Sequence, residues 1–321
     1  MPYQTVTMRP MESPRPDRRA WPADGTLDHW SVPDDGWPLR RLRIGNGTRG
    51  RMLLLGGRGD MIEKYLEPAV HWAAAGWRVT TFDWRGQGGS GRLLPQHGIG
   101  HFEDFGRWIG DLGALIADWN ADSDGPAVMV GHSMGGHLLL RALVEGVARP
   151  DAAVLIAPML GLRSAPIPQW AGPSIARAIC ALGFGRCPAW KEMPNSALRR
   201  WRLTHDAERY ADEVWWRTQT PEIAVGAPSW RWIAEAYRSM LATERSPRLS
   251  RMDVPTLVIG TTADRLVSPD AIVRVAGRLP DARLHMYGPE AAHEILREAD
   301  GVRLDAFARI DAFLDEKAPM A

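Results

Sequence analysis

The chain has 321 residues, of which 45% are hydrophobic, 24% charged and 8% aromatic, and its formal net charge is +1. This composition excludes an intrinsically disordered chain, and the near-zero charge gives no electrostatic basis for a dedicated nucleic-acid-binding protein. No run of about 18 apolar residues is present, so we expect no membrane-spanning helix. The N-terminus is rich in proline and arginine and lacks the apolar core of a secretion signal, so we expect a cytoplasmic protein.

The first 25 residues contain five prolines and no hydrophobic periodicity, and we interpret them as a flexible or wrapped arm. After the arm, short apolar runs that predict buried strands alternate with amphipathic stretches that predict helices. The predicted strands are 51–55, 77–82, 127–130, 152–156, 256–259 and 282–287. The predicted helices are 61–75, 102–119, 135–145, 269–278 and 303–316. This alternation predicts an α/β fold with a mostly parallel sheet covered by helices on both faces.

One long segment, residues 164–248, interrupts the alternation with helical patterns and no convincing strand. It carries seven tryptophans, and 12 lysines and arginines against 8 aspartates and glutamates. An insertion of this kind is most simply a helical cap over the carboxyl ends of the strands, where open α/β sheets place their binding sites. The predicted parts are therefore the arm (1–25), the first part of the core (26–163), the cap (164–248) and the second part of the core (249–321).

The strongest chemical signal is the sequence GHSMGG at residues 131–136. A predicted strand leads into it and a predicted helix leaves it, which is the context of a nucleophile elbow. Gly131 and Gly135 would let the strand and the helix approach each other closely. A glycine-rich turn with an ordinary serine remains the alternative, but the position between strand and helix favours a nucleophilic Ser133.

A nucleophilic serine needs a base, and the base needs an acid that orients it. His293, in the loop after the last predicted strand, is the predicted base. His285 lies within that strand, and His132 and His137 are too close to Ser133 in the chain to serve as its base.

In α/β-hydrolases the chain order is serine, acid, histidine, so the acid is expected between Ser133 and His293. Asp264 follows the strand at 256–259 by a short loop, which places it at the carboxyl end of that strand. Its rival is Asp270, but Ser268 and Pro269 are typical of the start of a helix, so Asp264 is preferred.

Five motifs occur in the order GGRGDMIEKY, DWRGQGGSGR, GHSMGG, LVIGTTADRLV and AAHEILRE. Together they resemble the monoacylglycerol lipase and bacterial lysophospholipase (lysophospholipase L2-like) branch of the α/β-hydrolase superfamily. The resemblance covers residues 39–158 and 254–313, is weakest in the cap and is absent from the arm. It implies an eight-stranded sheet, a triad of Ser133, Asp264 and His293, and an oxyanion hole formed by the backbone N–H groups of Arg58 and Met134.

The chain departs from the animal lipases of this branch in the oxyanion loop, where Gly56-Gly57-Arg58-Gly59 replaces their His-Gly-x-Gly. Because the donor is a backbone amide, Arg58 can still supply it. Its guanidinium either meets a phosphate or carbonyl of the substrate, or faces solvent or pairs with Asp60. The departure weakens the case for a monoglyceride substrate more than the case for hydrolase chemistry.

We therefore expect a serine hydrolase that cleaves esters of monoacyl lipids, lysophospholipids or monoacylglycerols, through an acyl-enzyme and without cofactor or metal. Cys180 and Cys187 are expected as free thiols, because they are too few for a disulfide framework. The alternatives are a short-chain carboxylesterase, an amidase or aminopeptidase with the same triad, and a non-catalytic binding protein with this fold.

The tryptophan-rich, basic cap predicts contact with an acyl chain and peripheral contact with the anionic inner face of a membrane. The alternative is that most of these tryptophans fill the small core of the cap itself. Trp215 and Trp216 cannot both face inward on one helix, so at least one is predicted to contact substrate or an interface. No nucleic-acid partner is expected, and the sequence does not specify an oligomeric state.

Overall fold

The computed structural model describes residues 18–95, 98–121, 125–164, 168, 170–191 and 197–320. Its strands are β1 (Thr26–Ser31), β2 (Pro38–Ile44), β3 (Gly50–Leu55), β4 (Trp77–Phe82), β5 (Ala127–His132), β6 (Ala152–Ile156), β7 (Thr256–Thr261) and β8 (Ala282–Tyr287). Its α-helices are α1 (Leu66–Ala74), α2 (Phe105–Ala121), α3 (Met134–Glu145), α4 (Gly172–Ala181), α5 (Ala197–Leu203), α6 (Ala207–Gln219), α7 (Trp230–Arg245), α8 (Pro269–Ala276) and α9 (Asp300–Lys317). Short 3₁₀ turns are η1 (Ile62–Tyr65), η2 (Phe184–Arg186), η3 (Pro221–Ile223), η4 (Leu249–Arg251) and η5 (Ile295–Arg297).

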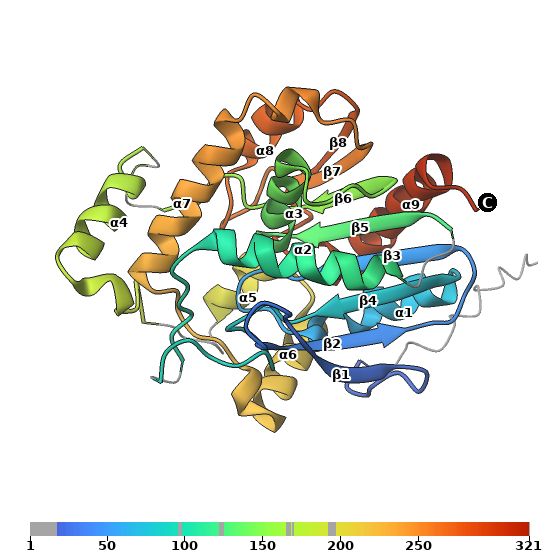
Figure 1. Ribbon diagram of the computed structural model, residues 1–321, viewed down its shortest axis with the longest axis horizontal. Helices are drawn as coiled ribbons and strands as arrows, with labels where there is room; N and C mark the ends of the chain where they lie inside the picture. Colours follow the sequence, from blue (N-terminus) through green and yellow to red (C-terminus); the bar gives the residue numbers. More distant parts are fainter. Residues whose placement is uncertain are drawn as a thin grey trace, which may run out of the picture.

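The strands of the described residues form one eight-stranded sheet in the order β1-β2-β4-β3-β5-β6-β7-β8 (Figure 1). β2 is antiparallel to both its neighbours, and every pairing from β4 to β8 is parallel. The predicted α/β-hydrolase fold with a mostly parallel sheet is therefore confirmed.

Helices cover both faces of the sheet, because the central strands are apolar on both sides. Along β3, Leu53 and Leu55 pack with α2, α3 and α8, whereas Met52 and Leu54 pack on the opposite face with α1 and α9. All four side chains are fully buried. Burial on both faces holds the carboxyl ends of β5 and β7, which precede the predicted site residues Ser133 and Asp264, in a rigid frame.

The first two strands were not predicted, because neither carries a continuous apolar run. β1 alternates exposed and half-buried residues at the edge of the sheet, with Asp28 facing Arg41 of β2. The second helix begins three residues later than the predicted start at 102, because the carboxylate of Asp104 accepts a hydrogen bond from the N–H of Gly106, 2.8 Å away. Such a side-chain acceptor is typical of a helix N-terminus.

Between β6 and β7 the described residues form α4 to α7 and no strand, and the limits predicted for a cap remain a prediction. α7 lies against α3, where Ser239 Oγ is 2.8 Å from Nε2 of His137. Burial lowers the pKa of His137 to about 3, so a neutral imidazole joins the two helices. Cys180 and Cys187 are free thiols. No helix of the described residues is long and apolar enough to cross a bilayer.

The arm predicted at 1–25 is described only from Arg18, and residues 1–17 lie outside the described residues. Its described end lies on α6. Arg18 and Arg19 both bind Asp212, with Nε–Oδ distances of 2.5 and 2.7 Å. Trp21 packs at a tilt on Trp216, with 5.5 Å between the ring centroids. This part of the chain therefore wraps against the inserted helices.

The start of α3 lies directly against the end of β3, and only glycine allows this distance. A Cβ atom on Gly135 would stand 2.4 Å from the carbonyl oxygen of Leu55 and 2.5 Å from that of Gly56. Both neighbours are backbone atoms, so neither can move aside as the end of a side chain would. The close approach brings Ser133, just before α3, beside the loop that follows β3.

We predict that Gly135→Ala lowers the free energy of unfolding by about 2–3 kcal/mol or more, because the new methyl group forces α3 away from β3. Gly110→Ala is the matched control, since Gly110 lies within α2 and a Cβ atom added there would have no atom within 4 Å. It should stabilise the protein by up to about 1 kcal/mol. Urea unfolding of both variants checks the prediction, and equal effects of the two substitutions would contradict it.

Candidate active site

Ser133 lies in a strained turn between β5 and α3, with φ 52° and ψ −116°. Such a backbone costs about 1–3 kcal/mol and persists only where the surroundings impose it. The N–H of Ser133 donates to the carbonyl of Ile156, 2.9 Å away, and its own carbonyl accepts from His137 and Met159 at 3.0 and 2.9 Å. These bonds hold the turn in place, as the predicted nucleophile elbow requires.

The structure brings the three predicted triad residues into contact from three separate strand ends. His293 Nε2 is 2.9 Å from Ser133 Oγ, and His293 Nδ1 is 2.7 Å from Asp264 Oδ2. Ser133 follows β5, Asp264 follows β7 and His293 follows β8. In this geometry the imidazole can accept the proton of the serine, while the carboxylate fixes its tautomer.

The surroundings of Asp264 favour its charged form. Its Oδ1 accepts hydrogen bonds from the N–H groups of Leu266 and Val267 at 2.8 and 2.9 Å. Burial alone would raise the pKa of Asp264, but His293 and these N–H groups bring it below its ordinary value. Burial alone would lower the pKa of His293. The Asp264 carboxylate stabilises the protonated ring by more than burial destabilises it, so the pKa of His293 lies above its ordinary value.

The rival acid, Asp270, lies in the first turn of α8. Ser268 caps this helix, with its hydroxyl accepting from the N–H of Ala271 at 3.3 Å, and Pro269 is the first helical residue. Asp270 is thus part of a helix start, as the sequence predicted. The structure does not bring it to His293, whose Nδ1 is bonded to Asp264.

The two predicted oxyanion donors belong to Met134, which follows the serine in the chain, and to the loop that carries Arg58. Met134 begins α3, so its N–H has no carbonyl partner within the helix. The loop that carries Arg58 passes beside Ser133, since a Cβ on Gly57 would lie 3.1 Å from the Cβ of the serine. Asp60 Oδ2 accepts from the N–H of Gly57 at 2.7 Å and thereby shapes this loop.

The side chain of Arg58 contacts the inserted helices. Its Nη1 donates to the carbonyl of Gly226 at 2.9 Å, and its guanidinium carbon lies 5.8 Å from the centroid of the Trp232 ring. The Asp60 carboxylate binds Lys64, Tyr65 and the N–H of Gly57. Arg58 therefore joins the oxyanion loop to the segment before α7.

Comparison with known proteins identifies the family. The sequence profile of the serine aminopeptidase S33 group, Hydrolase_4, matches residues 46–300. The chain belongs to this family of α/β-hydrolases. The predicted resemblance to the lysophospholipase L2 and monoacylglycerol lipase branch is confirmed at the family level.

Lysophospholipase L2 of Escherichia coli K12 is 30% identical to this hydrolase over 306 residues, covering 89% of this chain and 86% of the relative. A soluble variant of monoglyceride lipase from Saccharomyces cerevisiae has the same fold, with a TM-score of 0.74 and 21% identity over 95% of this chain and 100% of that one. A carboxyl esterase from Bacillus coagulans also shares the fold, with a TM-score of 0.72 and 16% identity over 91% of this chain and 98% of that one.

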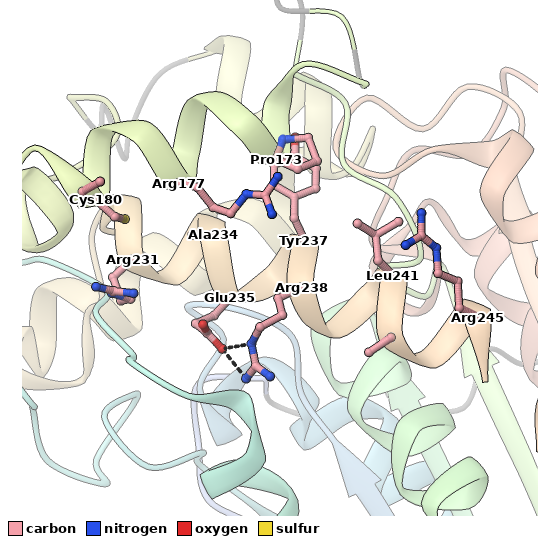
Figure 2. A pocket seen from close by; sticks show the side chains of 12 residues that line it. Pro173, Arg177, Cys180, Arg231, Ala234, Glu235, Tyr237, Arg238, Leu241 and Arg245 are labelled. Atoms are coloured by element: carbon pink, nitrogen blue, oxygen red, sulfur yellow. Dashed lines mark hydrogen bonds and ion pairs between the residues drawn. The ribbon is translucent and has the colours of Figure 1, made fainter.

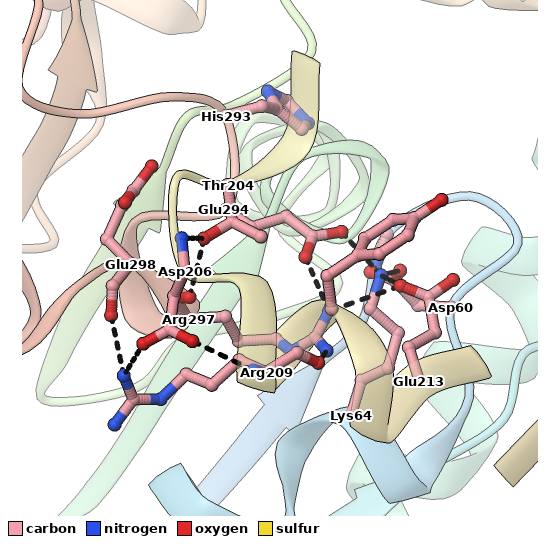
Figure 3. Close-up of polar contacts among 12 residues, drawn as sticks. Asp60, Lys64, Thr204, Asp206, Arg209, Glu213, His293, Glu294, Arg297 and Glu298 are labelled. Atoms are coloured by element: carbon pink, nitrogen blue, oxygen red, sulfur yellow. Dashed lines mark hydrogen bonds and ion pairs between the residues drawn. The ribbon is translucent and has the colours of Figure 1, made fainter. Parts of the chain in front are cut away.

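A buried ionic network adjoins the loop that holds His293, the predicted base (Figure 3). The ammonium of Lys64 contacts the carboxylates of Asp60, Glu294 and Glu213, the last two at 2.5 and 3.5 Å. Glu294 follows His293 in the chain and also accepts from Arg297 at 2.5 Å. Lys64 thus links the oxyanion loop, through Asp60, to the histidine loop, through Glu294.

The same network fastens α6 and the end of α5 to the histidine loop. The N–H of Glu294 donates to the carbonyl of Leu203 at 2.7 Å, and the hydroxyl of Thr204 donates to the carbonyl of Arg297 at 2.8 Å. Arg209 donates to the carbonyl of Glu298 at 2.9 Å. These helices are therefore bound to the loop that holds His293.

A second buried histidine, His132, contacts the backbone of His293. Nδ1 of His132 lies 3.0 Å from the hydroxyl of Tyr65, and its Nε2 lies 3.3 Å from the backbone carbonyl of His293. The sequence excluded His132 as the base, and the structure assigns it a contact that positions the base.

Sequence reasoning missed this network. A signal was present, because Asp60 and Lys64 are four residues apart, and Glu294 and Arg297 three residues apart, with two neighbouring apolar residues within each pair. Charged residues with this spacing usually form exposed helix pairs. Only the packing of α6 over both segments shows that these are buried.

Trp215 and Trp216 pack where α6 meets the segment after β3. Trp216 is buried with Met61, Ile62 and Leu66, and its indole N–H donates to the carbonyl of Arg18 at 3.0 Å. Trp215 is partly buried on the same cluster. The structure thus places both rings in packing contacts, and a role in substrate binding stays a prediction.

We predict that kcat/KM falls as the pH drops through the pKa of His293, because the protonated ring cannot accept the serine proton. Asp264 raises this pKa above the ordinary value of about 6.5. Asp264→Asn should therefore move the acidic limb to lower pH and reduce kcat by about 10⁴-fold. Asp270→Asn, the matched control, should leave the pH profile unchanged, and a similar loss in both variants would contradict the assignment.

We predict that Lys64→Met lowers the free energy of unfolding by about 3–5 kcal/mol near neutral pH, because three buried carboxylates lose their shared cation. Burial lowers the pKa of Lys64, but Asp60, Glu213 and Glu294 raise it overall, so the charged form is stabilised on folding. The loss should shrink at acidic pH, where these carboxylates become protonated.

Urea unfolding at neutral and acidic pH measures this effect. Lys317→Met is the control, because Lys317 pairs with Asp281 at 3.4 Å on the surface. Its cost should be about 0–1 kcal/mol at either pH. A loss for Lys64→Met no larger than that of the control would show that the network contributes nothing measurable.

Proposed function

We propose that this protein is a serine ester hydrolase that cleaves monoacyl lipids, lysophospholipids or monoacylglycerols, with Ser133, Asp264 and His293 as its triad. The observation that carries the proposal is the pair of hydrogen bonds that connects Ser133 Oγ through His293 to Asp264. Ser133 also has the left-handed backbone, with φ 52°, that is typical of a nucleophile elbow. The similarity to lysophospholipase L2 supports a lipid ester as substrate.

The reaction begins when His293 Nε2 takes the proton of Ser133, whose oxygen attacks the ester carbonyl. Asp264 holds Nδ1–H and stabilises the imidazolium that forms. The N–H groups of Met134 and Arg58 donate to the oxyanion of the tetrahedral intermediate. Each such donor contributes about 3–4 kcal/mol to transition-state stabilisation.

Collapse of the intermediate breaks the ester bond, and His293 returns the proton to the leaving alcohol. The glycerol or glycerophospho group departs, and the acyl chain stays on Ser133. A water molecule, deprotonated by the same histidine, then attacks the acyl-enzyme and releases the fatty acid. No cofactor or metal takes part in this sequence.

The second candidate is a short-chain carboxylesterase, or an amidase or aminopeptidase, with the same three residues. It is favoured by the name of the family, serine aminopeptidase S33. A monoacyl substrate is preferred for this chain because its relative at 30% identity is a lysophospholipase. The same proposal includes peripheral contact with an anionic membrane, where monoacyl lipids are concentrated.

We predict that purified protein releases fatty acid from lysophosphatidylcholine, lysophosphatidylethanolamine or monoacylglycerol, and that Ser133→Ala lowers kcat by about 10⁶-fold. The panel should also contain p-nitrophenyl esters from acetate to palmitate and an aminoacyl p-nitroanilide. Ser133→Ala should lose labelling by a fluorophosphonate probe. Ser246→Ala, on the turn that directly follows α7, is the matched control.

Two outcomes would contradict parts of the proposal. Cleavage of short-chain esters or the anilide alone would exclude a monoacyl lipid substrate and favour the second candidate. Absence of both labelling and hydrolysis in the wild type would favour a non-catalytic binding protein. If the wild type prefers lysophospholipids over monoacylglycerol and Arg58→Ala loses this preference, the Arg58 guanidinium binds the phosphate group of the substrate.

A further inference from the structure

The helix α4 projects at one end of the molecule, away from the sheet (Figure 1). It packs on α7 and η2, and only Gly172 and Ala176 of its ten residues are buried. Its sequence, GPSIARAICA, contains a single charge, at Arg177. A helix this apolar and this exposed is unusual on the surface of a protein that stays in water.

Large apolar side chains are exposed at both ends of α4. Trp170 is 83% exposed, Leu182 73%, Phe184 56% and Trp190 50%. In the described part of the chain, just two other large apolar residues are at least half exposed, and both lie at or beyond α9. Three of the four are aromatic, the residue class that is enriched at the interface between membrane and water.

A groove of about 600 Å³ lies beside these residues, between α4 and α7 (Figure 2). Alanine, leucine and tyrosine side chains form much of its wall, and four arginines line it: Arg177, Arg231, Arg238 and Arg245. The three on α7 are seven residues apart, which places them on one face of the helix. The groove therefore combines an apolar wall with a row of guanidinium groups.

Most of this positive charge is not neutralised. Glu235 is the acidic residue of the lining, and it accepts from Arg238 at 2.8 Å. Arg177, Arg231 and Arg245 form no hydrogen bond or ion pair with any residue that the structure describes. Three guanidiniums without a directly bound carboxylate, near exposed aromatic side chains, form a surface that suits an anionic, amphiphilic partner.

We infer that this α4 surface, comprising α4, η2, Trp170, Trp190 and the groove-lining face of α7, docks the protein on an anionic lipid bilayer. Phosphate groups of anionic lipids lie against the groove arginines, and the apolar side chains enter the interfacial layer. The inference rests on the proposed function, because a docked enzyme takes a monoacyl lipid from the surface where it resides.

A bilayer fits this surface better than a second copy of the chain. A symmetric contact would place the arginines of both copies against one another, and like charges at an interface are strongly unfavourable. The exposed apolar side chains precede and follow α4 in the chain, and a fluid layer can accommodate such separate groups. The surface also differs from Trp215 and Trp216, whose rings pack on α1 and its neighbours.

The test is sedimentation of the full chain with vesicles of phosphatidylcholine, with and without phosphatidylglycerol. The wild type should bind the anionic vesicles, and added salt should weaken binding. Arg177→Gln/Arg245→Gln should weaken partitioning by about 30-fold, since each basic residue near the surface contributes about fivefold. Leu182→Ser/Phe184→Ser should weaken it by about tenfold or more.

Each variant has a matched control at residues outside the α4 surface. Arg149→Gln/Arg251→Gln removes two exposed charges, and Val273→Ser/Leu304→Ser removes two exposed apolar groups from α8 and α9. Both controls should bind like the wild type. Equal binding by the α4 variants and their controls would overturn the inference.

A second readout separates this inference from the proposed function. All four variants should hydrolyse soluble p-nitrophenyl butyrate at the wild-type rate, because none of the changed residues touches the triad. Failure of the wild type to bind anionic vesicles, with hydrolysis intact, would overturn the docking surface alone. A dimer in solution that dissociates in Leu182→Ser/Phe184→Ser would show that a second copy covers α4, and would also overturn it.

Discussion

The left-handed backbone at Ser133 is the constraint on which the site depends. A non-glycine residue at φ 52° is stable only where its neighbours leave it no alternative. Here the carbonyl of Ile156 and the N–H groups of His137 and Met159 bind the residue from both sides. Because Gly135 lets α3 contact the end of β3, the same turn sets the serine beside the oxyanion loop. One strained residue thus places the predicted nucleophile beside the loop that carries Arg58.

The inserted helices divide into two parts with different physical character. Around α6, charged side chains such as Glu213 are fully buried and paired with Lys64 and Arg297, so breaking these contacts would leave charges without partners. Around α4, guanidiniums and aromatic rings face outward. The part around α6 holds the loop of the predicted catalytic histidine. The part around α4 is exposed and can contact a surface outside the protein. Local composition alone does not separate them, since both are rich in tryptophan and arginine.

Sequence patterns were sufficient to predict the central sheet and to select three site residues that the structure brings into contact. The runs at β4, β6 and β8 were predicted with their observed bounds. The edge strand β1 was missed because one face meets solvent and its residues are mixed. Ser133, Asp264 and His293 could each be found because each lies at or shortly after the carboxyl end of a strand, and parallel strands end at one edge of the sheet.

The sequence by itself determined the α/β-hydrolase fold and the identity of the groups at the strand ends, because both depend on local patterns and chain order. Tertiary structure alone decided which charges are buried and which are exposed. Lys64 and Arg177 look equivalent in the sequence, yet one lies among three carboxylates and the other in an open groove. Glu213 and Glu294, which contact Lys64, and the residues of α7 that line the groove with Arg177 lie more than fifty residues away in the chain. No local sequence pattern records such contacts.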